Sequence, residues 1–245
     1  MGGFLKGLSV IEAFDRGREA LTIAEIAKAT GLDRATARRC LLTLQRVGYA
    51  EMDGRQFRLT PRILRLGFAY LAATPLPRLV QPYLDRLSDS TQESCSVSVL
   101  DDTELVYVAR ASQRRVLSIG LNVGSRLPVY CTSMGRVLLA SLPDAEARSI
   151  LDRSERRKLT THTITDLEAL LEILRKIAED GYATVDQELE IGLRSIAVPL
   201  RNSRGRVIAA LNVGAQAARV GVDRMTSEFL PAMREVQSDI ARLLS

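Results

Sequence analysis

Apolar residues recur at helical spacing through the first third of the chain. Residues 5–14 (LKGLSVIEAF) place them three and four positions apart, which predicts an amphipathic helix. A second, short helix begins after Thr22, because Thr22 and Glu25 form a T-x-x-E capping box, and it ends at Gly31. Asp33 can cap a third and longer helix, DRATARRCLLTLQRVGY. The pattern therefore predicts three helices in close succession.

The third predicted helix has one apolar face and one polar, basic face. The apolar face consists of Leu32, Ala37, Cys40, Leu41, Leu44 and Val47. The polar face consists of Arg34, Thr36, Arg38, Arg39 and Thr43. A short helix, a turn with glycine and a longer helix with a basic N-terminal half form the order of a helix-turn-helix, whose second helix enters the major groove. Arginine can bond guanine edges, and all five polar side chains can bind phosphate, so we expect them to contact DNA.

A β-hairpin is predicted directly after the third helix. Asp53 and Gly54 separate two strand-like runs, YAEM and RQFRL, and an Asp-Gly pair in this context is a strong hairpin signal. After a recognition helix such a hairpin is a wing, and Arg55 and Arg58 on it can reach phosphate or a minor groove. A helical subdomain with solvated arginines is the alternative. The ordered set of elements favours a winged helix-turn-helix domain over residues 1–60.

The next segment predicts a linker helix over residues 61–76. Thr60 and Pro61 open it as cap and first helical residue, and the prolines of TPLP end it. Its apolar face, with Ile63, Leu64, Phe68 and Leu71, requires a partner, which is either another part of the chain or a second copy. Helix-turn-helix proteins usually bind paired half-sites as dimers. We therefore favour a second copy as this partner and expect a homodimer.

From residue 93 the hydrophobic pattern changes to alternation, which is typical of strands. The strand candidates are CSVSVLDD, ELVYVAR, RVLSIGL, YATVDQEL, SIAVPLRN and VIAALNVGA, with a turn at Asn202-Ser203-Arg204-Gly205 between the last two. Helices are expected at 134–142, 144–152, 166–180 and 224–244. Adjacent strands with short turns and grouped helices predict an α+β domain around an antiparallel sheet, over residues 77–245.

Charge separates the two parts of the chain. Residues 1–75 hold 12 Lys and Arg against 7 Asp and Glu, whereas residues 76–245 hold 22 of each, so the whole excess of +5 lies in the first part. This distribution suits a polyanionic partner such as double-stranded DNA. No apolar run approaches the roughly 18 residues of a membrane span, and the N-terminus lacks the features of a signal peptide. We expect a cytoplasmic protein with no membrane partner.

The residues that could carry catalysis are few. The three cysteines lack metal-ligand or redox spacing, and the single histidine, His162, lies in a polar stretch. No nucleophile elbow or nucleotide-binding glycine motif is present. Asp186, Glu188 and Glu190 alternate on a predicted strand, either as paired acids or as solvated or structural charges. We expect no enzyme, cofactor or metal. A metabolic enzyme fused to a DNA-binding module and an architectural protein whose second domain only oligomerises stay as alternatives.

Several long segments resemble the IclR family of transcription regulators. They are KGLSVIEAF, LTIAEIAKATGL, TARRCLLTL and LGFAYL in the first part, and residues 124–142 and 181–214 in the second. The resemblance covers nearly the whole chain. LTPRILRLG, ESCSVSVLDD, TSMGRVLLA, DQELEIGLRSIAVP and FLPAMR are further similar to the branch that controls the β-ketoadipate pathway, which degrades aromatic acids such as protocatechuate and 4-hydroxybenzoate.

The resemblance implies a GAF-like effector-binding domain that takes a small organic acid, either an aromatic acid or a dicarboxylate. It also implies dimers through the N-terminal region and tetramers through the effector domains. The pocket positions that it carries over are Val116, Ile119, Ser133, Met134, Ser195, Asn212 and Gly214. Met134, Asn212 and Gly214 stand where relatives that hold very small acids have small polar residues, which suggests a larger or differently shaped ligand.

The residues of CTSMGRVLLA point to the same region without the resemblance. This segment begins a predicted helix whose first turn, with Ser133 and Gly135, offers unpaired N–H groups to a carboxylate. Arg126 or Arg136 can pair with an acid, although either can equally be a surface charge. Val116 and Met134 can equally be core. The sequence therefore predicts a ligand-switched transcription factor that reads a pseudo-palindromic operator.

Overall fold

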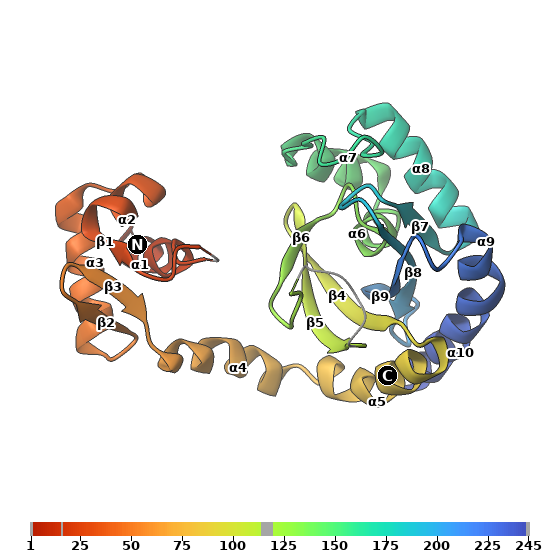
Figure 1. Cartoon of the computed structure of the whole chain (residues 1–245), viewed down its shortest axis with the longest axis horizontal. Coiled ribbons are helices and arrows are strands. Elements are labelled where there is room, and N and C mark those ends of the chain that lie inside the picture. The colour runs from red at the N-terminus through yellow and green to blue at the C-terminus, as the bar shows by residue number, and fades with distance from the viewer. Residues whose placement is uncertain (1, 16, 114–119, 244–245) are drawn as a thin grey trace. The chain divides into compact units, whose positions relative to one another are not determined.

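The computed structural model describes residues 2–15, 17–113 and 120–243, and its contacts divide the chain into two units (Figure 1). The first unit comprises residues 1–73 and the second comprises residues 74–245. The finer division into three parts at residues 60 and 76 stays a prediction. Among the described residues, the structure has no helix that is both long and apolar enough to cross a membrane.

The described residues of the first unit begin with three helices and a small antiparallel sheet. The helices are α1 (Gly2–Glu12), α2 (Ile23–Thr30) and α3 (Arg34–Arg46). The strands β1 (Leu21–Thr22), β2 (Ala50–Asp53) and β3 (Gln56–Leu59) pair in the order β1-β3-β2. Val10, Ile26, Ala37, Leu41 and Phe57 form the buried centre. The predicted helices and hairpin are confirmed, and β1 adds a third strand that the pattern did not predict.

The ends of α2 and α3 are set by local hydrogen bonds. The Thr22 hydroxyl accepts from the Glu25 amide at 3.3 Å, and the Glu25 carboxylate accepts from the Thr22 amide at 2.8 Å, which confirms the capping box. These hydrogen bonds hold the pKa of Glu25 below its ordinary value. Gly31 ends α2 in the left-handed region at φ 70°. Asp33 then caps α3 by accepting from the Thr36 amide at 2.8 Å.

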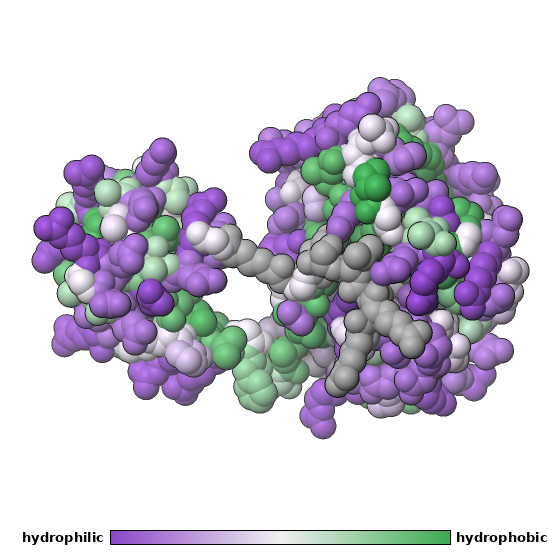
Figure 2. All heavy atoms as spheres, viewed as in Figure 1, coloured by the Kyte–Doolittle hydropathy of each residue, from purple (hydrophilic) through white to green (hydrophobic). Residues whose placement is uncertain are grey.

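A short 3-10 turn (Pro61–Ile63) and helix α4 (Leu64–Ala73) follow the hairpin. Thr60 caps the turn through its hydroxyl, which accepts from the Arg62 amide at 3.3 Å, and Pro61 is its first residue. No side chain of α4 is buried. Figure 2 shows the hydrophobic residues at the surface of this helix.

The second unit is built on a six-stranded antiparallel sheet in the order β6-β5-β4-β9-β8-β7 (Figure 1). Its strands are β4 (Ser94–Asp101), β5 (Glu104–Ala111), β6 (Arg126–Pro128), β7 (Ala183–Asp186), β8 (Leu193–Arg201) and β9 (Val207–Gln216). The predicted antiparallel sheet is confirmed. Strand β6 was not predicted, and most of the candidate strand RVLSIGL, including Val116 and Ile119, lies outside the described residues.

Helices cover both faces of this sheet. One face packs against α5 (Leu76–Thr91) and the C-terminal segment, which consists of α9 (Val222–Arg224), a π-helical turn (Met225–Phe229) and α10 (Leu230–Leu243). The other face packs against α6 (Ser133–Leu139), behind which lie α7 (Asp144–Arg153) and α8 (Leu167–Asp180). Side chains alternate between the two faces, so β5, β8 and β9 contribute to both cores.

The three acids that alternate in the sequence do not share a strand face, which corrects the interpretation of that segment. Strand β7 ends at Asp186, and Gln187 follows in the left-handed region at φ 60°. Asp186 pairs with Arg194 at 2.8 Å. Glu188 lies in the turn beyond the strand, where it is buried. The turn reverses the chain at this point, so the alternation in the sequence continues past the end of the strand.

Candidate functional site

The exposed surface of α3 is basic. Arg34, Arg38 and Arg39 are exposed, and the described part of the chain shows no carboxylate within ion-pair distance of them. Thr43 is also exposed, and its hydroxyl donates to the backbone oxygen of Arg39 at 2.8 Å. Charges without a local counter-ion on one helix face are suited to a polyanion. Four of the five predicted side chains on this helix are therefore available for contact.

Thr36 is the exception, and its placement on the outward face was wrong. Its side chain is buried, with 6% of its surface exposed, and it accepts a hydrogen bond from Arg39 at 3.1 Å. Helix α1 lies along this flank of α3, and the groove between them includes Phe4, Leu8 and Thr36. Val47 was likewise assigned to the buried face, but it follows the last turn of α3 and is exposed.

The hairpin after α3 presents two further arginines. Asp53 pairs with Gln56, so Gly54 and Arg55 form a two-residue loop, and Gly54 takes the positive φ of 60° that the tight turn requires. Arg55 at the tip and Arg58 on β3 are both exposed. The hairpin thus carries positive charge at the place where a wing would meet a nucleic acid backbone.

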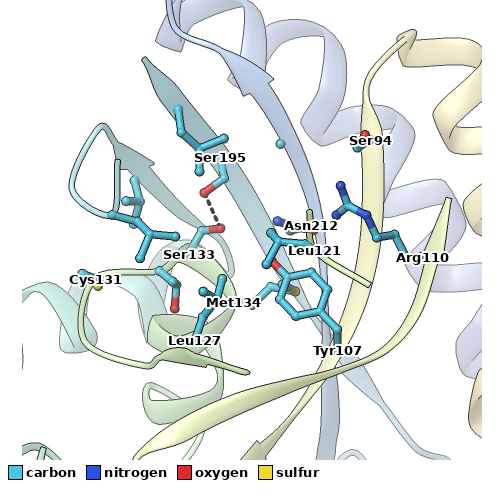
Figure 3. A pocket seen from close by; sticks show the side chains of 15 residues that line it. Ser94, Tyr107, Arg110, Leu121, Leu127, Cys131, Ser133, Met134, Ser195 and Asn212 are labelled. Atoms are coloured by element: carbon cyan, nitrogen blue, oxygen red, sulfur yellow. Dashed lines mark hydrogen bonds between the residues drawn. The ribbon is translucent and has the colours of Figure 1, made fainter. Parts of the chain in front are cut away.

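A cavity lies in the second unit between the sheet and the start of α6, with about 580 Å³ of atom-free space, part of it open to solvent (Figure 3). Small side chains on neighbouring strands form its floor. One row across the sheet runs Ser94, Gly214, Ser195 on β4, β9 and β8. The next row contains Ser96 and Asn212. Because these residues are small, the helix covers this face without filling it.

A β-bulge determines which side chains of β5 face this cavity. Val97 pairs with Ala109 and Ser98 pairs with Tyr107, so β5 has one extra residue, Val108, at this point. The extra residue shifts the alternation by one position, and Tyr107 and Arg110 therefore lie on the same face of the sheet. Both line the cavity. Without the bulge Arg110 would lie on the opposite face.

Arg110 is a cation without a counter-ion among the described residues. Its Nε donates to the Ser112 hydroxyl and its Nη1 to the Ser96 hydroxyl, both at 2.9 Å, and no described carboxylate pairs with it. Burial lowers the pKa of its guanidinium. A guanidinium has five N–H donors and stays protonated, so donors remain for a ligand. Arg110 therefore gives the cavity a positive charge.

Most of the remaining lining residues are apolar, apart from Thr132, the Tyr107 hydroxyl and the two places described next. Apolar side chains come from Tyr107, Leu121, Leu127, Cys131, Met134, Val185, Leu189 and Leu193. On the side of α6, the Ser133 hydroxyl donates to the Ser195 hydroxyl at 2.8 Å. Asn212 lies between this pair and Arg110 in Figure 3, and its Oδ1 is the one enclosed side-chain atom of the described residues that lacks a hydrogen-bond partner. Such an atom beside a cavity is typical of a binding site.

Models of two protein families match the chain, one for each unit. The IclR helix-turn-helix domain matches residues 5–54, and the bacterial transcriptional regulator IclR C-terminal domain matches residues 68–242. The chain belongs to the IclR family of bacterial transcriptional regulators. It is therefore an IclR-type DNA-binding regulator, and its relatives are named as regulators and not as enzymes.

Relatives of this IclR-family chain include regulators of aromatic acid catabolism. The chain is 44% identical to the Pca regulon regulatory protein of Pseudomonas putida, over 100% of this chain and 84% of that protein. It is 36% identical to the p-hydroxybenzoate hydroxylase transcriptional activator of Acinetobacter baylyi, over 100% and 92%. The crystal structure of an IclR homolog complexed with 4-hydroxybenzoate, from Microbacterium hydrocarbonoxydans, matches at a TM-score of 0.82 and 28% identity, over 99% of both chains.

Five of the predicted effector residues of this regulator lie together. Ser133, Met134, Ser195, Asn212 and Gly214 all line the cavity. Val116 and Ile119 lie outside the described residues.

Three other predicted effector residues do not belong to the lining. Gly135 packs α6 against the preceding segment, because a Cβ there would meet the backbone of Val129 at 2.4 Å. Arg126 is on the surface and pairs with Asp101 and Glu104, both at 2.7 Å. Arg136 is a buried residue of α6 whose side chain does not line the cavity.

Arg136 has a structural partner, which corrects its assignment as a partner for a ligand carboxylate. Its two Nη atoms donate to the two carboxylate oxygens of Glu188, both at 2.7 Å, and its Nε donates to the Tyr130 backbone oxygen at 2.8 Å. The Ile164 amide donates to the same carboxylate at 3.0 Å. The pair joins α6 to the turn after β7, and that turn carries Leu189 to the cavity wall.

The sequence reasoning missed Arg110, the charge of the cavity. Alternation along ELVYVAR places Tyr107 and Arg110 on opposite faces, and only the bulge brings them together. One signal was present: three serines alternate in β4, at 94, 96 and 98, on a strand that lies inside the sheet. Small polar residues on one face of a buried strand indicate either a packed hydrogen-bond network or a cavity. The serine pattern of β4 was therefore a signal for a cavity on this face of the sheet.

Proposed function

We propose that this IclR-type regulator controls genes of aromatic acid catabolism, in the β-ketoadipate pathway, in response to a small organic acid bound in its second unit. The single observation that carries the proposal is the cavity cation Arg110, which has no counter-ion among the described residues. An organic acid would supply that counter-ion through a charge-assisted hydrogen bond. The names of the relatives and the 4-hydroxybenzoate complex support an aromatic acid, or a dicarboxylate derived from one.

The operator is bound through α3 and the hairpin. Arg34, Arg38 and Arg39 contact DNA from the exposed face of α3, with Thr43 beside them, and Arg55 and Arg58 contact the backbone from the wing. Support comes from the exposure of these residues and from the match of residues 5–54 to the IclR helix-turn-helix domain. A recognition helix reads bases in the major groove, and phosphate contacts set its register.

The protein works as a homodimer, which the uncovered apolar surface of the first unit supports. Leu64 and Phe68 lie one turn apart on α4 and are 71% and 68% exposed. Phe4 and Leu5 on α1 are also largely exposed. Exposed apolar side chains that lie together, as Leu64 and Phe68 do on α4, mark an interaction surface, and a second copy also provides the second recognition helix for a paired half-site. Homotetramers through the second units are the further state that the family implies.

The acid changes transcription only through a difference in affinity for two states of the protein. Its binding site lies in the second unit, between the sheet and α6. The two states therefore differ in this part of the protein, and binding shifts their populations. The direction of the effect on transcription depends on where the operator lies relative to the promoter.

Thermal unfolding of the full chain tests the proposal. Protocatechuate, 4-hydroxybenzoate, β-ketoadipate, adipate and unrelated acids are added separately. An acid present at about 100 times its dissociation constant stabilises the bound protein by roughly 2.7 kcal/mol, which gives a readable rise in the melting temperature. A selective rise with one pathway acid supports the proposal. No rise with any of them contradicts the aromatic acid assignment, while operator binding in the same preparation shows whether the DNA-binding unit is intact.

A further inference from the structure

We propose that the effector binds across the sheet with two polar ends: its carboxylate pairs with Arg110, and a second oxygen-bearing group meets the hydroxyl pair of Ser133 and Ser195. This inference rests on the proposed function and adds the orientation of the ligand. It places the carboxylate away from the first turn of α6, where the sequence pattern had placed it.

The charges of the described residues indicate where in the cavity the carboxylate of the ligand binds. The other arginines near this part of the sheet have acidic partners: Arg126 pairs with Asp101 and Glu104, Arg136 with Glu188, and Arg194 with Asp186. Arg110 is half-buried, lines the cavity and donates only to two serine hydroxyls. An anion placed anywhere else in the cavity would leave both its own charge and that of Arg110 without a partner, which is costly away from water.

The hydroxyl pair of Ser133 and Ser195 indicates where the second oxygen-bearing group of the ligand binds. Ser133 is almost fully buried, and its hydroxyl donates to Ser195. Each hydroxyl has one hydrogen to donate and two lone pairs. The Ser195 hydrogen and the lone pairs of Ser133 therefore remain for a ligand oxygen that can accept or donate. Neither serine carries a charge, so this end suits a ring hydroxyl better than the second carboxylate of an open-chain acid.

The order of the strands separates the two ends. Arg110 lies on β5 and Ser195 on β8, with β4 and β9 between them. Three strand spacings correspond to roughly 14 Å between the backbones, and the long Arg110 side chain covers part of that span. Figure 3 shows Ser133 and Ser195 on one side of Asn212 and Arg110 on the other. The apolar walls between them, with Tyr107 and Met134, suit the carbon skeleton of the ligand.

Two ligand sources share this chemistry, a hydroxylated benzoate and an open-chain dicarboxylate, and the test separates them. Calorimetric titrations of the full chain compare 4-hydroxybenzoate with benzoate, and adipate with hexanoate. In each pair the second compound lacks only the far oxygen group. The wild-type protein is expected to bind the two-ended member of one pair at least about ten times more tightly than its one-ended parent, and that pair identifies the source.

Two substitutions then show which end of the ligand binds at Arg110 and which end binds at Ser195. Arg110→Met is expected to weaken both members of the responsive pair by the same factor, about 10- to 100-fold, because both carry the carboxylate. Ser195→Ala is expected to weaken only the two-ended member, by about five- to tenfold. Arg110→Gln serves as a second variant if Arg110→Met does not fold. Arg126→Met and Ser203→Ala, at the surface, are matched controls that should leave all four affinities unchanged.

A reversed pattern overturns the orientation. If Ser195→Ala weakens the one-ended acid and Arg110→Met spares it, the carboxylate lies at the serines. Equal wild-type affinities within both pairs would remove the role of the hydroxyl pair. Binding of none of the four acids, in a preparation that still binds its operator, would contradict the proposed effector class and this orientation with it.

Discussion

Arg136 and Glu188 form a buried, two-pronged ion pair, with 3% and 6% of their side chains exposed and both N–O distances at 2.7 Å. The pair connects the helix that lines one wall of the cavity with the turn that supplies another. Its charges are satisfied by each other, by the Tyr130 oxygen and by the Ile164 amide. The pair therefore holds two walls of the cavity in a fixed relation without contacting the ligand itself.

Removing one partner of this pair should lower the free energy of unfolding strongly, whereas replacing both partners with apolar residues should lower it little. Glu188→Gln or Arg136→Met alone leaves an unpaired buried group and is expected to destabilise the protein by about 3–5 kcal/mol. The double variant Arg136→Met with Glu188→Leu should recover most of that loss. Urea unfolding of the full chain measures both. If the double variant were as unstable as the single ones, packing and not charge would determine the stability at this site.

The exposed arginines of α3 should determine operator affinity. Arg38→Ala and Arg39→Ala are each expected to weaken binding by about 1–3 kcal/mol if they contact bases, or to reduce the salt slope by about one if they contact phosphate. Fluorescence anisotropy with an operator fragment selected by the wild-type protein measures this at several salt concentrations. Arg206→Ala, in the second unit, is the matched control. Unchanged affinity and salt slope in both α3 variants would exclude α3 as the recognition helix.

Two glycines near the cavity should respond differently to alanine. A Cβ on Gly135 would meet the Val129 backbone at 2.4 Å, so Gly135→Ala must shift α6 and is expected to destabilise the protein by about 1–3 kcal/mol. A Cβ on Gly214 meets nothing within 4 Å, so Gly214→Ala should keep the stability and only narrow the cavity. Melting temperatures without ligand separate the two effects. Equal melting temperatures would show that α6 tolerates the shift.

The apolar face of α4 should control the oligomeric state. Phe68→Glu places a charge in a surface that would be buried between two copies, so we expect a shift from dimer to monomer and a loss of operator affinity. Sedimentation velocity measures the first and anisotropy the second. Arg65→Gln, on the same helix, makes the same charge change of one unit at an exposed polar position and serves as the control. A wild-type protein that sediments as a monomer would contradict the proposed dimer.

The Asp186–Arg194 pair should make stability depend on pH. The side-chain hydrogen bond from Arg194 holds the pKa of Asp186 below its ordinary value of 3.8. A depressed folded-state pKa stabilises the protein above the unfolded pKa, and this contribution is lost as the pH falls through the folded value. The wild-type protein should therefore be more stable than Asp186→Asn at about pH 7, and the difference should be smaller at about pH 3. The effect is small because Asp186 is 44% exposed. A constant difference between urea midpoints at both pH values would argue against the ion pair as its source.

The sequence predicted best those features that depend on neighbours in the chain. The capping box of Thr22 and Glu25, the stop at Gly31 and the hairpin turn, which lies at Gly54 and Arg55, one residue beyond the predicted pair, each involve residues within a few positions of one another. Thr36 was misplaced because α1, a separate helix, covers that flank of α3. Periodicity within one helix contains no information about its neighbours.

The prediction of the cavity residues was limited in the same way. Ser133, Ser195 and Asn212 were named through the family resemblance, and the structure places them together. The role expected of Arg136 failed because its partner Glu188 is 52 positions away. Arg110 was missed because strand pairing, and not the sequence of β5 alone, creates the bulge at Val108. Long-range pairing therefore decided which charges face the ligand.

The bulge at Val108 also shows which change of chain length the cavity would tolerate. Deletion of Val108 alone would leave Tyr107 and Arg110 two positions apart, and regular alternation would still place both side chains on the face of the cavity. The strand would lose its irregularity, and the cavity would keep its positive charge. In this fold the loss of one codon at the bulge would therefore preserve a binding site for anions.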